Sequence, residues 1–380
     1  MKNLSECRVL IVDDVKANVD VLVEALRSDH KLSVALDGES ALRNIEKNPP
    51  DLVLLDIVMP GLDGYEVCRR LRAAPNTQDI PIMFLSSLDE VKNKTQGFEV
   101  GGNDYLTKPF EVLEVKARVR SLLKAKAYSD AVKEKIAAEL AIAREIQLGI
   151  LPSNIPAQVA GTNFEICAVL EAALEVGGDL YEVLRLDNGR LLVAVGDVSG
   201  KGIPASLFMA VTTTLLRTMA RQYRKPEEIV LQVNDALAVQ NPRGMFVTLA
   251  CMIVDTVTAN VTCANAGHLS AVLLRPGAEP RLVLESTAML AGVMEGIPVE
   301  SESLQLQPGD TLALYTDGVT EAFNAKGKMF EEAGLLECLR DAAGRRADET
   351  VKIILDAVRR HAAGFPQSDD LTLVAVRRVG

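Results

Sequence analysis

The sequence predicts an α/β protein with a doubly wound (βα)5 domain first, a helical linker next and a second domain of short strands and helices last. Apolar runs alternate with amphipathic segments in the first third of the chain, which indicates a parallel sheet. Residues 111–150 contain no proline, which favours one long helix. With 380 residues, 48% hydrophobic and 24% charged, the chain has the composition of a globular protein and the length of two or three domains.

Four apolar runs define the strands of the first domain. They cover residues 8–12, 51–55 and 80–85, and the fourth stops at Lys108. Between them, apolar residues recur at helical spacing, as in Val19 and its neighbours one and two turns on. In parallel sheets built this way, ligand sites lie at the carboxyl ends of the strands.

Polar residues follow each of these runs and are therefore expected at one edge of the sheet. Asp13 and Asp14 follow the first run and Asp56 follows the second. Three converging carboxylates repel one another unless a cation neutralises them, which suggests Mg²⁺. Lys108 offers a positive charge and Ser86 a hydroxyl to a phosphoryl group. Taken singly, each aspartate is also explained as a turn or helix-cap residue.

The joint pattern resembles the receiver domain of two-component response regulators, over residues 1–124. The resemblance implies phosphorylation by a sensor histidine kinase and a cis peptide bond before Pro109. The site residues that it implies are the phospho-acceptor Asp56, the Mg²⁺ ligands Asp13 and Asp14 together with Asp56, the phosphoryl-contacting Ser86 and Lys108, and the switch aromatic Tyr105.

The segment 125–152 is predicted to be a helical linker that forms a parallel coiled coil in a homodimer. Its apolar residues recur with alternating steps of three and four on an otherwise charged helix, which ends at Pro152. The alternative is a helix packed on either domain of its own chain, and Glu139 at a seam position weakens the coiled-coil interpretation. The stripe consists of Val132, Ile136, Ala143, Ile146 and Ile150.

The stretch EVGGDLYEV at 175–183 has two interpretations, a nucleotide cyclase of the GGDEF type or a metal-dependent phosphatase. The cyclase needs a second acid where this chain has Leu180, and leucine neither binds a metal nor moves a proton. A two-metal phosphatase needs carboxylates from several distant segments. Asp197 and Asp317 each follow a strand-like run, and Asp369 precedes the last one. Taken alone, each of these aspartates is more simply explained as part of a hairpin turn.

In this order, and with ANAGH at 264–268 and EAF at 321–323, these motifs resemble the type 2C Ser/Thr phosphatases of the stage II sporulation E branch. AREIQLGILP resembles the segment that precedes them. The resemblance implies an αββα sandwich over 153–380 and two Mn²⁺ or Mg²⁺ ions. The catalytic and metal-binding residues that it implies are the bridging Asp197, the carbonyl of Val198, Asp317 and Asp369 on one ion, and Asp179 at the second ion.

The chain departs from that family pattern at two positions. Glu182 stands where an aspartate is usual, and Ala173 replaces a frequent proline. Neither change removes an implied metal ligand. His268 is more simply explained as a loop-shaping residue than as a catalytic acid.

The composition of the chain argues against some classes of function. A net charge of −11 argues against nucleic-acid binding, and no apolar run approaches a membrane span, so the cytoplasm is expected. The six cysteines form no CxxC pair and are expected to be buried thiols. The predicted function is a phosphorylation-controlled Ser/Thr phosphatase that acts on an anti-sigma-factor antagonist. The alternative is a binding adaptor with a phosphatase-like domain that hydrolyses nothing.

Overall fold

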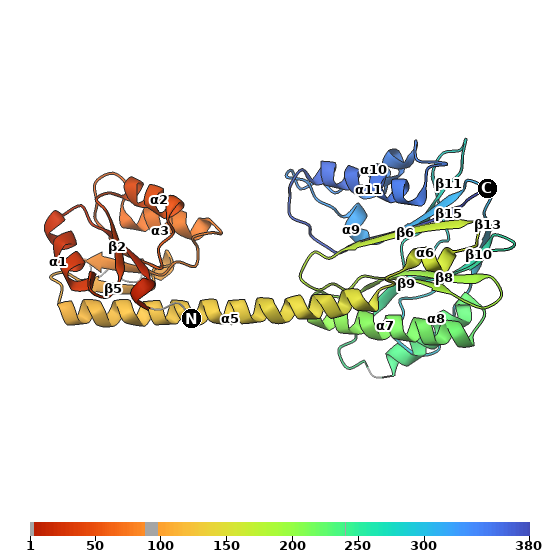
Figure 1. Cartoon of the computed structure of the whole chain (residues 1–380), viewed down its shortest axis with the longest axis horizontal. Coiled ribbons are helices and arrows are strands. Elements are labelled where there is room, and N and C mark those ends of the chain that lie inside the picture. The colour runs from red at the N-terminus through yellow and green to blue at the C-terminus, as the bar shows by residue number, and fades with distance from the viewer. Residues whose placement is uncertain (1–3, 88–97, 240) are drawn as a thin grey trace. The chain divides into compact units, whose positions relative to one another are not determined.

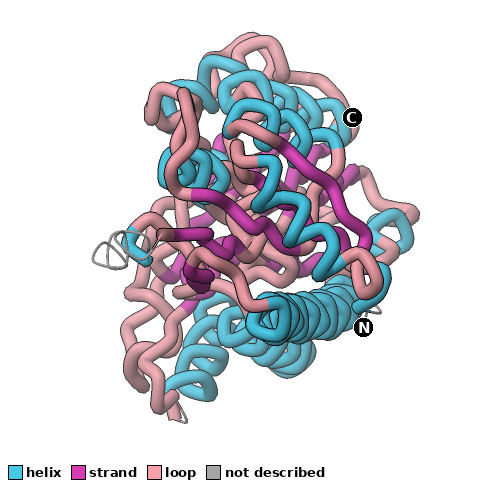
Figure 2. Tube along the Cα trace, turned by 90° about the vertical axis from the view of Figure 1, so that its left-hand side faces the viewer, coloured by secondary structure: helices cyan, strands magenta, loops and turns pink. Residues whose placement is uncertain are grey.

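The computed structural model describes residues 4–87, 98–239 and 241–380, and the chain divides into two units, Met1–Ala138 and Glu139–Gly380. The division falls inside one long helix, α5 (Val112–Ile150), within the predicted linker. This helix is uninterrupted over its 39 residues (Figure 1, Figure 2).

The first unit contains a five-stranded parallel sheet in the order β2-β1-β3-β4-β5, as predicted for a doubly wound domain. Apolar clusters fill both faces of the sheet, because its central strands are buried on both sides. The elements are the 3-10 turn Leu4–Glu6, β1 (Arg8–Val12), α1 (Lys16–Leu26), β2 (Lys31–Ala35), α2 (Gly38–Lys47), β3 (Leu52–Asp56), α3 (Gly64–Ala73), β4 (Ile82–Ser86) and β5 (Asp104–Thr107).

Strand β2 was not among the four apolar runs of the sequence. It lies at the edge of the sheet, and only its last residue, Ala35, is buried. An edge strand therefore shows little of the apolar pattern that marks a central one. Residues 88–97, between β4 and β5, lie outside the described ranges, and a (βα)5 order predicts a helix in this part of the chain.

The second unit contains two antiparallel five-stranded sheets, β13-β10-β9-β8-β7 and β12-β11-β14-β15-β6. The strands are β6 (Phe164–Glu171), β7 (Leu180–Arg185), β8 (Arg190–Val198), β9 (Val247–Asp255), β10 (Asn260–Ala266), β11 (Ala271–Leu274), β12 (Arg281–Val283), β13 (Glu302–Gln305), β14 (Thr311–Tyr315) and β15 (Leu371–Arg378).

Helices cover the outer face of each sheet, so the unit has four layers (Figure 1). Helices α7 and α8 pack on the first sheet, whereas α11 packs on the second sheet and α10 packs against α11. One apolar cluster joins the facing sides of the two sheets. This arrangement confirms the predicted αββα sandwich. The helices are α6 (Ile155–Val159), α7 (Ile203–Gln222), α8 (Pro226–Ala238), α9 (Asp317–Thr320), α10 (Glu331–Leu339) and α11 (Ala347–Ala362).

Helix α7 departs from the expectation that no segment resembles a membrane span. By length and composition alone, its 20 residues suffice to cross a membrane. One side of the helix, which includes Ala205, Met209 and Leu216, is fully buried against β7, β8 and α8. We therefore interpret α7 as a core helix of the sandwich.

The apolar stripe of α5 is largely exposed. Closer to the start of the helix, Val115 and Val119 are buried in the core of the first unit. Farther along, Val132, Ile136 and Ile146 are 39%, 51% and 63% exposed. These stripe residues are therefore accessible to a second helix.

Candidate active site and phosphorylation site

The polar residues at the carboxyl edge of the parallel sheet lie close together. Carboxylate oxygens of Asp13, Asp14 and Asp56 lie within 4.8 Å of one another. Lys108 Nζ lies 2.9 Å from Asp13 Oδ2 and 2.7 Å from Asp56 Oδ2. Burial raises the pKa of Asp56 to about 6, an effect that Lys108 opposes and Asp13 reinforces. The bond from Lys108 to Pro109 is cis, which confirms that prediction.

Two further residues complete this edge. The Ser86 hydroxyl is buried and has no hydrogen-bond partner among the described residues, so it is available to a group bound next to Asp56. The Tyr105 ring is buried, with its centroid 5.4 Å from that of Phe84 and 5.2 Å from that of Phe98.

The second unit brings four aspartates together from two sheets. Asp179 immediately precedes β7, and Asp197 lies near the end of β8, the antiparallel neighbour of β7. Asp317 follows β14, and Asp369 precedes β15, the antiparallel neighbour of β14. Each sheet therefore contributes two carboxylates from adjacent strands.

Burial and neighbouring charges raise the pKa values of three of these four aspartates. Burial, followed by the charges of Asp317 and Asp369, raises the pKa of Asp197 to about 7. Burial, followed by the charge of Asp197, raises the pKa of Asp179 well above its ordinary value. Burial and Asp369 also raise the pKa of Asp317. Keeping these buried carboxylates ionised costs free energy when no cation is present. Hard divalent cations prefer carboxylate oxygens as ligands, so this group of aspartates suits them.

Two threonines hold Asp179 in place. The hydroxyls of Thr316 and Thr372 donate hydrogen bonds of 2.7 and 2.6 Å to Asp179 Oδ2. Thr316 follows β14 and Thr372 lies in β15, so residues of the second sheet orient an acid of the first sheet.

The Gly-Gly-Asp turn fits its surroundings only because its first two residues lack side chains. A Cβ on Gly177 would lie 2.1 Å from Asp370 Oδ2, and one on Gly178 would lie 2.8 Å from the carbonyl oxygen of Val198. The glycines therefore let the turn approach the Val198 carbonyl, one of the oxygens expected to face a metal. The close approach of the turn to this carbonyl therefore fits a two-metal centre, as the four aspartates do.

A family model described as stage II sporulation protein E (SpoIIE) matches residues 187–379, half of the chain. The chain belongs to the SpoIIE family. A second model, the response regulator receiver domain, matches residues 9–120. The protein therefore combines a response regulator receiver domain with a SpoIIE domain, which has the PP2C-like phosphatase fold.

Relatives match parts of this combination. The response regulator PleD of Caulobacter vibrioides is 41% identical over 129 residues, which cover 34% of this chain and 28% of PleD. Protein IcfG of Synechocystis is 30% identical over 268 residues, which cover 63% of this chain and 41% of IcfG. The chain thus spans less than half the length of either relative.

Solved structures share the fold of the SpoIIE domain. The SiaA-PP2C domain of Pseudomonas aeruginosa superposes with a TM-score of 0.58 at 24% identity, over 65% of this chain and 98% of that one. The PP2C phosphatase domain of SpoIIE from Bacillus subtilis, with a fragment of its regulatory domain, superposes with a TM-score of 0.50 at 22% identity, over 56% and 63% of the two chains.

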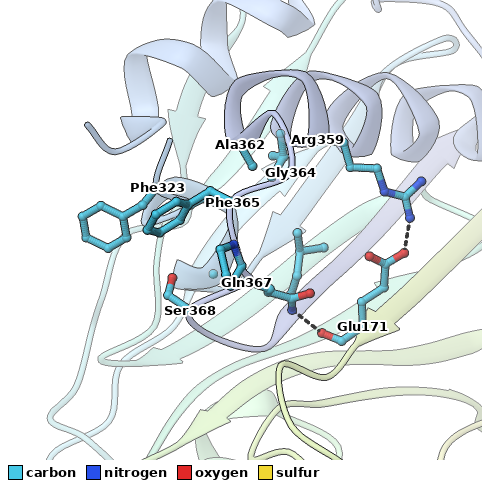
Figure 3. A pocket seen from close by; sticks show the side chains of 13 residues that line it. Glu171, Phe323, Arg359, Ala362, Gly364, Phe365, Gln367 and Ser368 are labelled. Carbon is cyan, nitrogen blue, oxygen red and sulfur yellow. Dashed lines mark hydrogen bonds and ion pairs between the residues drawn. The ribbon is translucent and has the colours of Figure 1, made fainter. Parts of the chain in front are cut away.

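A pocket of about 350 Å³ lies in the SpoIIE domain (Figure 3). Its lining includes Gly318 and Ser368, the chain neighbours of Asp317 and Asp369. Phe323 and Phe365 both line the pocket, and Figure 3 shows their rings on the same side of it. On the opposite side Arg359 pairs with Glu171 at 2.5 Å, and Gln367 donates to the backbone carbonyl of Glu171.

Sequence reasoning missed the role of Asp370. This buried residue accepts hydrogen bonds from the backbone N–H of Ala173 at 2.8 Å and of Gly178 at 2.7 Å. It thereby supports the turn that carries Asp179. The only signal in the sequence was its position beside Asp369, which does not reveal the distant turn that it contacts.

Glu182 and Arg217 form a second contact that the sequence did not indicate. Glu182 is buried and Arg217 Nε lies 2.6 Å from its Oε2, so the departure from the family pattern has a partner on α7. Burial raises the pKa of Glu182, and the charge of Arg217 opposes that rise.

His268 lies buried in a loop, as expected from the sequence. Its Nδ1 is 2.8 Å from the Thr248 hydroxyl, and its backbone N–H donates to Asn265. Burial lowers its pKa to about 4, so the imidazole is neutral near pH 7. The six cysteines are all free, four are buried and two are half-buried, which agrees with structural thiols.

Proposed function

We propose that this protein is a response regulator in which phosphorylation of Asp56 controls a metal-dependent protein Ser/Thr phosphatase. The observation that carries the enzymatic part is the convergence of four aspartates whose burial and mutual repulsion raise the pKa values of three of them. An adaptor has no chemical need for such a cluster. The family relationship and the shared PP2C-like fold support the same conclusion.

In this proposal Asp197 would hold both of two Mn²⁺ or Mg²⁺ ions. Asp317 and Asp369 would hold one ion together with the Val198 carbonyl, and Asp179 would serve the second ion. When bound, such ions lower the pKa of a shared water and neutralise charge on the phosphoryl group.

Side chains near the four aspartates hold these carboxylates in position. Thr316 and Thr372 fix the direction of Asp179 through their hydrogen bonds. Lys201 Nζ, 2.9 Å from Asp369 Oδ2, holds that carboxylate and places a positive charge at its edge. The pocket lined by Gly318 and Ser368, the chain neighbours of Asp317 and Asp369, gives room to residues that flank a phosphoserine or phosphothreonine of the substrate.

In this proposal the receiver domain controls the activity of the phosphatase domain. We propose that a sensor histidine kinase phosphorylates Asp56 with Mg²⁺ held by Asp13, Asp14 and Asp56. In this proposal Ser86 and Lys108 contact the phosphoryl group. The buried hydroxyl of Ser86 has no partner among the described residues, and the ammonium of Lys108 lies 2.7 Å from Asp56 Oδ2, which supports these roles. Tyr105 changes position in response, and the change reaches the second unit through α5 in a homodimer.

The substrate in this proposal is a small phosphoprotein, an anti-sigma-factor antagonist, in the cytoplasm. Its support is the resemblance of the motif set to phosphatases of sigma-factor partner switching. The net charge of −11 gives no basis for a nucleic-acid partner.

The test is hydrolysis of p-nitrophenyl phosphate and of a phosphoserine protein by the full chain, titrated with Mn²⁺ after removal of metal. We expect turnover that depends on metal and is lost in EDTA. If metal-loaded protein bound the phosphoprotein but hydrolysed neither substrate, the adaptor function would replace this proposal.

A further inference from the structure

The pocket in the SpoIIE domain reaches the backbone beside two of the four aspartates (Figure 3). Gly318 lines it and directly follows Asp317. Gly318 also packs against the segment that precedes β15, because a Cβ on it would overlap the carbonyl oxygen of Asp370. Ser368, another lining residue, lies on that segment. One end of the pocket is therefore formed where the segments that carry Asp317 and Asp369 meet.

A single lysine connects the pocket with one of these acids. Lys201 Nζ lies 2.6 Å from the carbonyl oxygen of Ser368 and 2.9 Å from Asp369 Oδ2. Because one ammonium group contacts both oxygens, the edge of the pocket at Ser368 and the carboxylate of Asp369 are neighbours. A phosphoprotein bound at the acids therefore brings the residues next to its phosphoserine to the pocket, since consecutive Cα atoms are only about 3.8 Å apart.

The lining of the pocket is largely apolar. Val358 of α11 and Leu371 of β15 are buried residues of this lining. The rings of Phe323 and Phe365 also line it, from the segments that follow α9 and α11. Phe365 is 45% exposed, so an apolar side chain bound against it would remove ring surface from water, which is favourable.

The polar side chains of the lining are already engaged. Arg359 and Glu171 are the charged residues among the described residues that line the pocket, and they form an ion pair with each other. Gln367 Nε2 donates hydrogen bonds to the backbone carbonyls of Glu171 and Asp369 at 2.8 and 2.7 Å. A charged substrate side chain would therefore lose water here without gaining an unpaired partner, which is unfavourable.

We propose that this pocket is a specificity subsite that binds an apolar side chain of the substrate, aromatic or long aliphatic, next to the phosphorylated serine or threonine. The proposal rests on the proposed phosphatase function and adds to it the chemical class of the sequence around the phosphorylated residue. Phe323 and Phe365 supply the apolar contacts, while the phosphoryl group lies at the acids beyond Gly318 and Ser368.

The test uses the full chain with Mn²⁺ and peptides in which alanines surround one phosphoserine. A single guest residue, which is leucine, phenylalanine, aspartate or lysine, replaces one of the two nearest alanines on either side. At one of these positions we expect leucine and phenylalanine to raise kcat/KM by roughly tenfold over alanine, mainly through KM, whereas aspartate and lysine give no gain. Equal kcat/KM for all guests at every position would overturn the proposal.

Two variants test whether the pocket causes this preference. Phe365→Ala removes apolar surface and Ala362→Leu fills part of the pocket, so each should reduce the gain from leucine and phenylalanine to about threefold or less. Each gain is a ratio measured on one protein, so a loss of folded enzyme does not affect it. Val257→Ala, at an 81% exposed position outside the lining, is the matched control and should keep the gain. An unchanged gain in both pocket variants would overturn the proposal.

Peptide binding separates this proposal from the proposed function. Fluorescein-labelled forms of the same peptides are titrated with the Asp197→Asn chain in Mn²⁺, and binding is followed by anisotropy. We expect leucine and phenylalanine at one position to bind roughly tenfold more tightly than alanine. Equal binding of all guests would contradict the subsite. If the unchanged protein hydrolyses no phosphate ester, the proposed phosphatase function fails, while the binding preference still decides whether the pocket recognises an apolar side chain.

Discussion

Asp370 Oδ2 lies 2.7 Å from the backbone nitrogen of Gly178, although 192 residues separate them in the chain. The same side chain accepts a hydrogen bond from Ala173 through its other oxygen. A residue at the start of the last strand therefore shapes the Gly-Gly-Asp turn near the start of the sandwich.

Replacing Asp370 by alanine leaves these two backbone N–H groups without acceptors. We expect Asp370→Ala to lower the free energy of unfolding by about 1–3 kcal/mol and to increase the Mn²⁺ requirement. Asp370→Asn retains one acceptor oxygen and is expected to have a smaller effect. Urea unfolding and a Mn²⁺ titration of turnover measure the two effects. Equal stability of all three proteins would show that the contacts with the turn contribute nothing.

Asp197 is expected to be essential for turnover but not for folding. Asp197→Asn removes one charge from a crowded group of acids, so the metal-free variant should melt at a higher temperature than the unchanged protein. Its turnover with Mn²⁺ should fall by roughly a thousandfold. Asp187→Asn on an exposed loop is the matched control. A variant with wild-type turnover would refute the proposed metal centre.

The same residue predicts how stability depends on pH. The pKa of Asp197 is about 7 in the folded chain and returns towards 3.8 on unfolding. Between these values the folded state binds more protons, so the free energy of unfolding should fall as pH rises through this window. In EDTA, we expect the melting temperature to decrease from about pH 5 to about pH 8, and less steeply in Asp197→Asn. A melting temperature that rises over this range would contradict the shift.

Asp56 is expected to carry the phosphoryl group. Acetyl phosphate with Mg²⁺ should label the protein with an acyl phosphate that hydroxylamine removes. Asp56→Ala should abolish the label, whereas Asp20→Ala, on the exposed side of α1, should leave it intact. Undiminished labelling of Asp56→Ala would place the phosphate on another residue.

The exposed stripe of α5 is expected to pair two chains and to transmit the receiver signal. Ile136→Asp and Ile146→Asp together place charges in the proposed seam, so mass in solution should shift to that of a monomer. The response of turnover to beryllofluoride, a phosphate mimic, should be lost. In the unchanged protein we expect the mimic to activate by several-fold to about a hundredfold.

Ile142→Asp is the matched control for this experiment. Ile142 lies on the same helix and is 59% exposed, but it is not part of the stripe. This variant should remain dimeric and responsive. A double variant that still responds to the mimic would show that coupling does not run through the stripe.

Much of the first unit was predictable from local pattern. Central strands such as β1 and β3 are buried on both faces, so they appear in the sequence as continuous apolar runs, and the residues that follow them lie at one edge of the sheet by geometry alone. This is why Asp13, Asp56 and Lys108 were expected to be close together. Strand β2 was not predicted, because an edge strand is only partly buried and lacks a continuous apolar run.

The supports of the active site depended on tertiary structure. The sequence by itself determined which acids are available, since Asp179, Asp197, Asp317 and Asp369 stand in recognisable turns. Only the tertiary structure decided the contacts of Gln147 with Gly177, because hydrogen bonds between segments distant in the chain leave no periodic pattern behind. Local propensity and burial act on neighbouring residues and can be read along the chain, whereas these contacts arise only when two sheets and a helix end pack together.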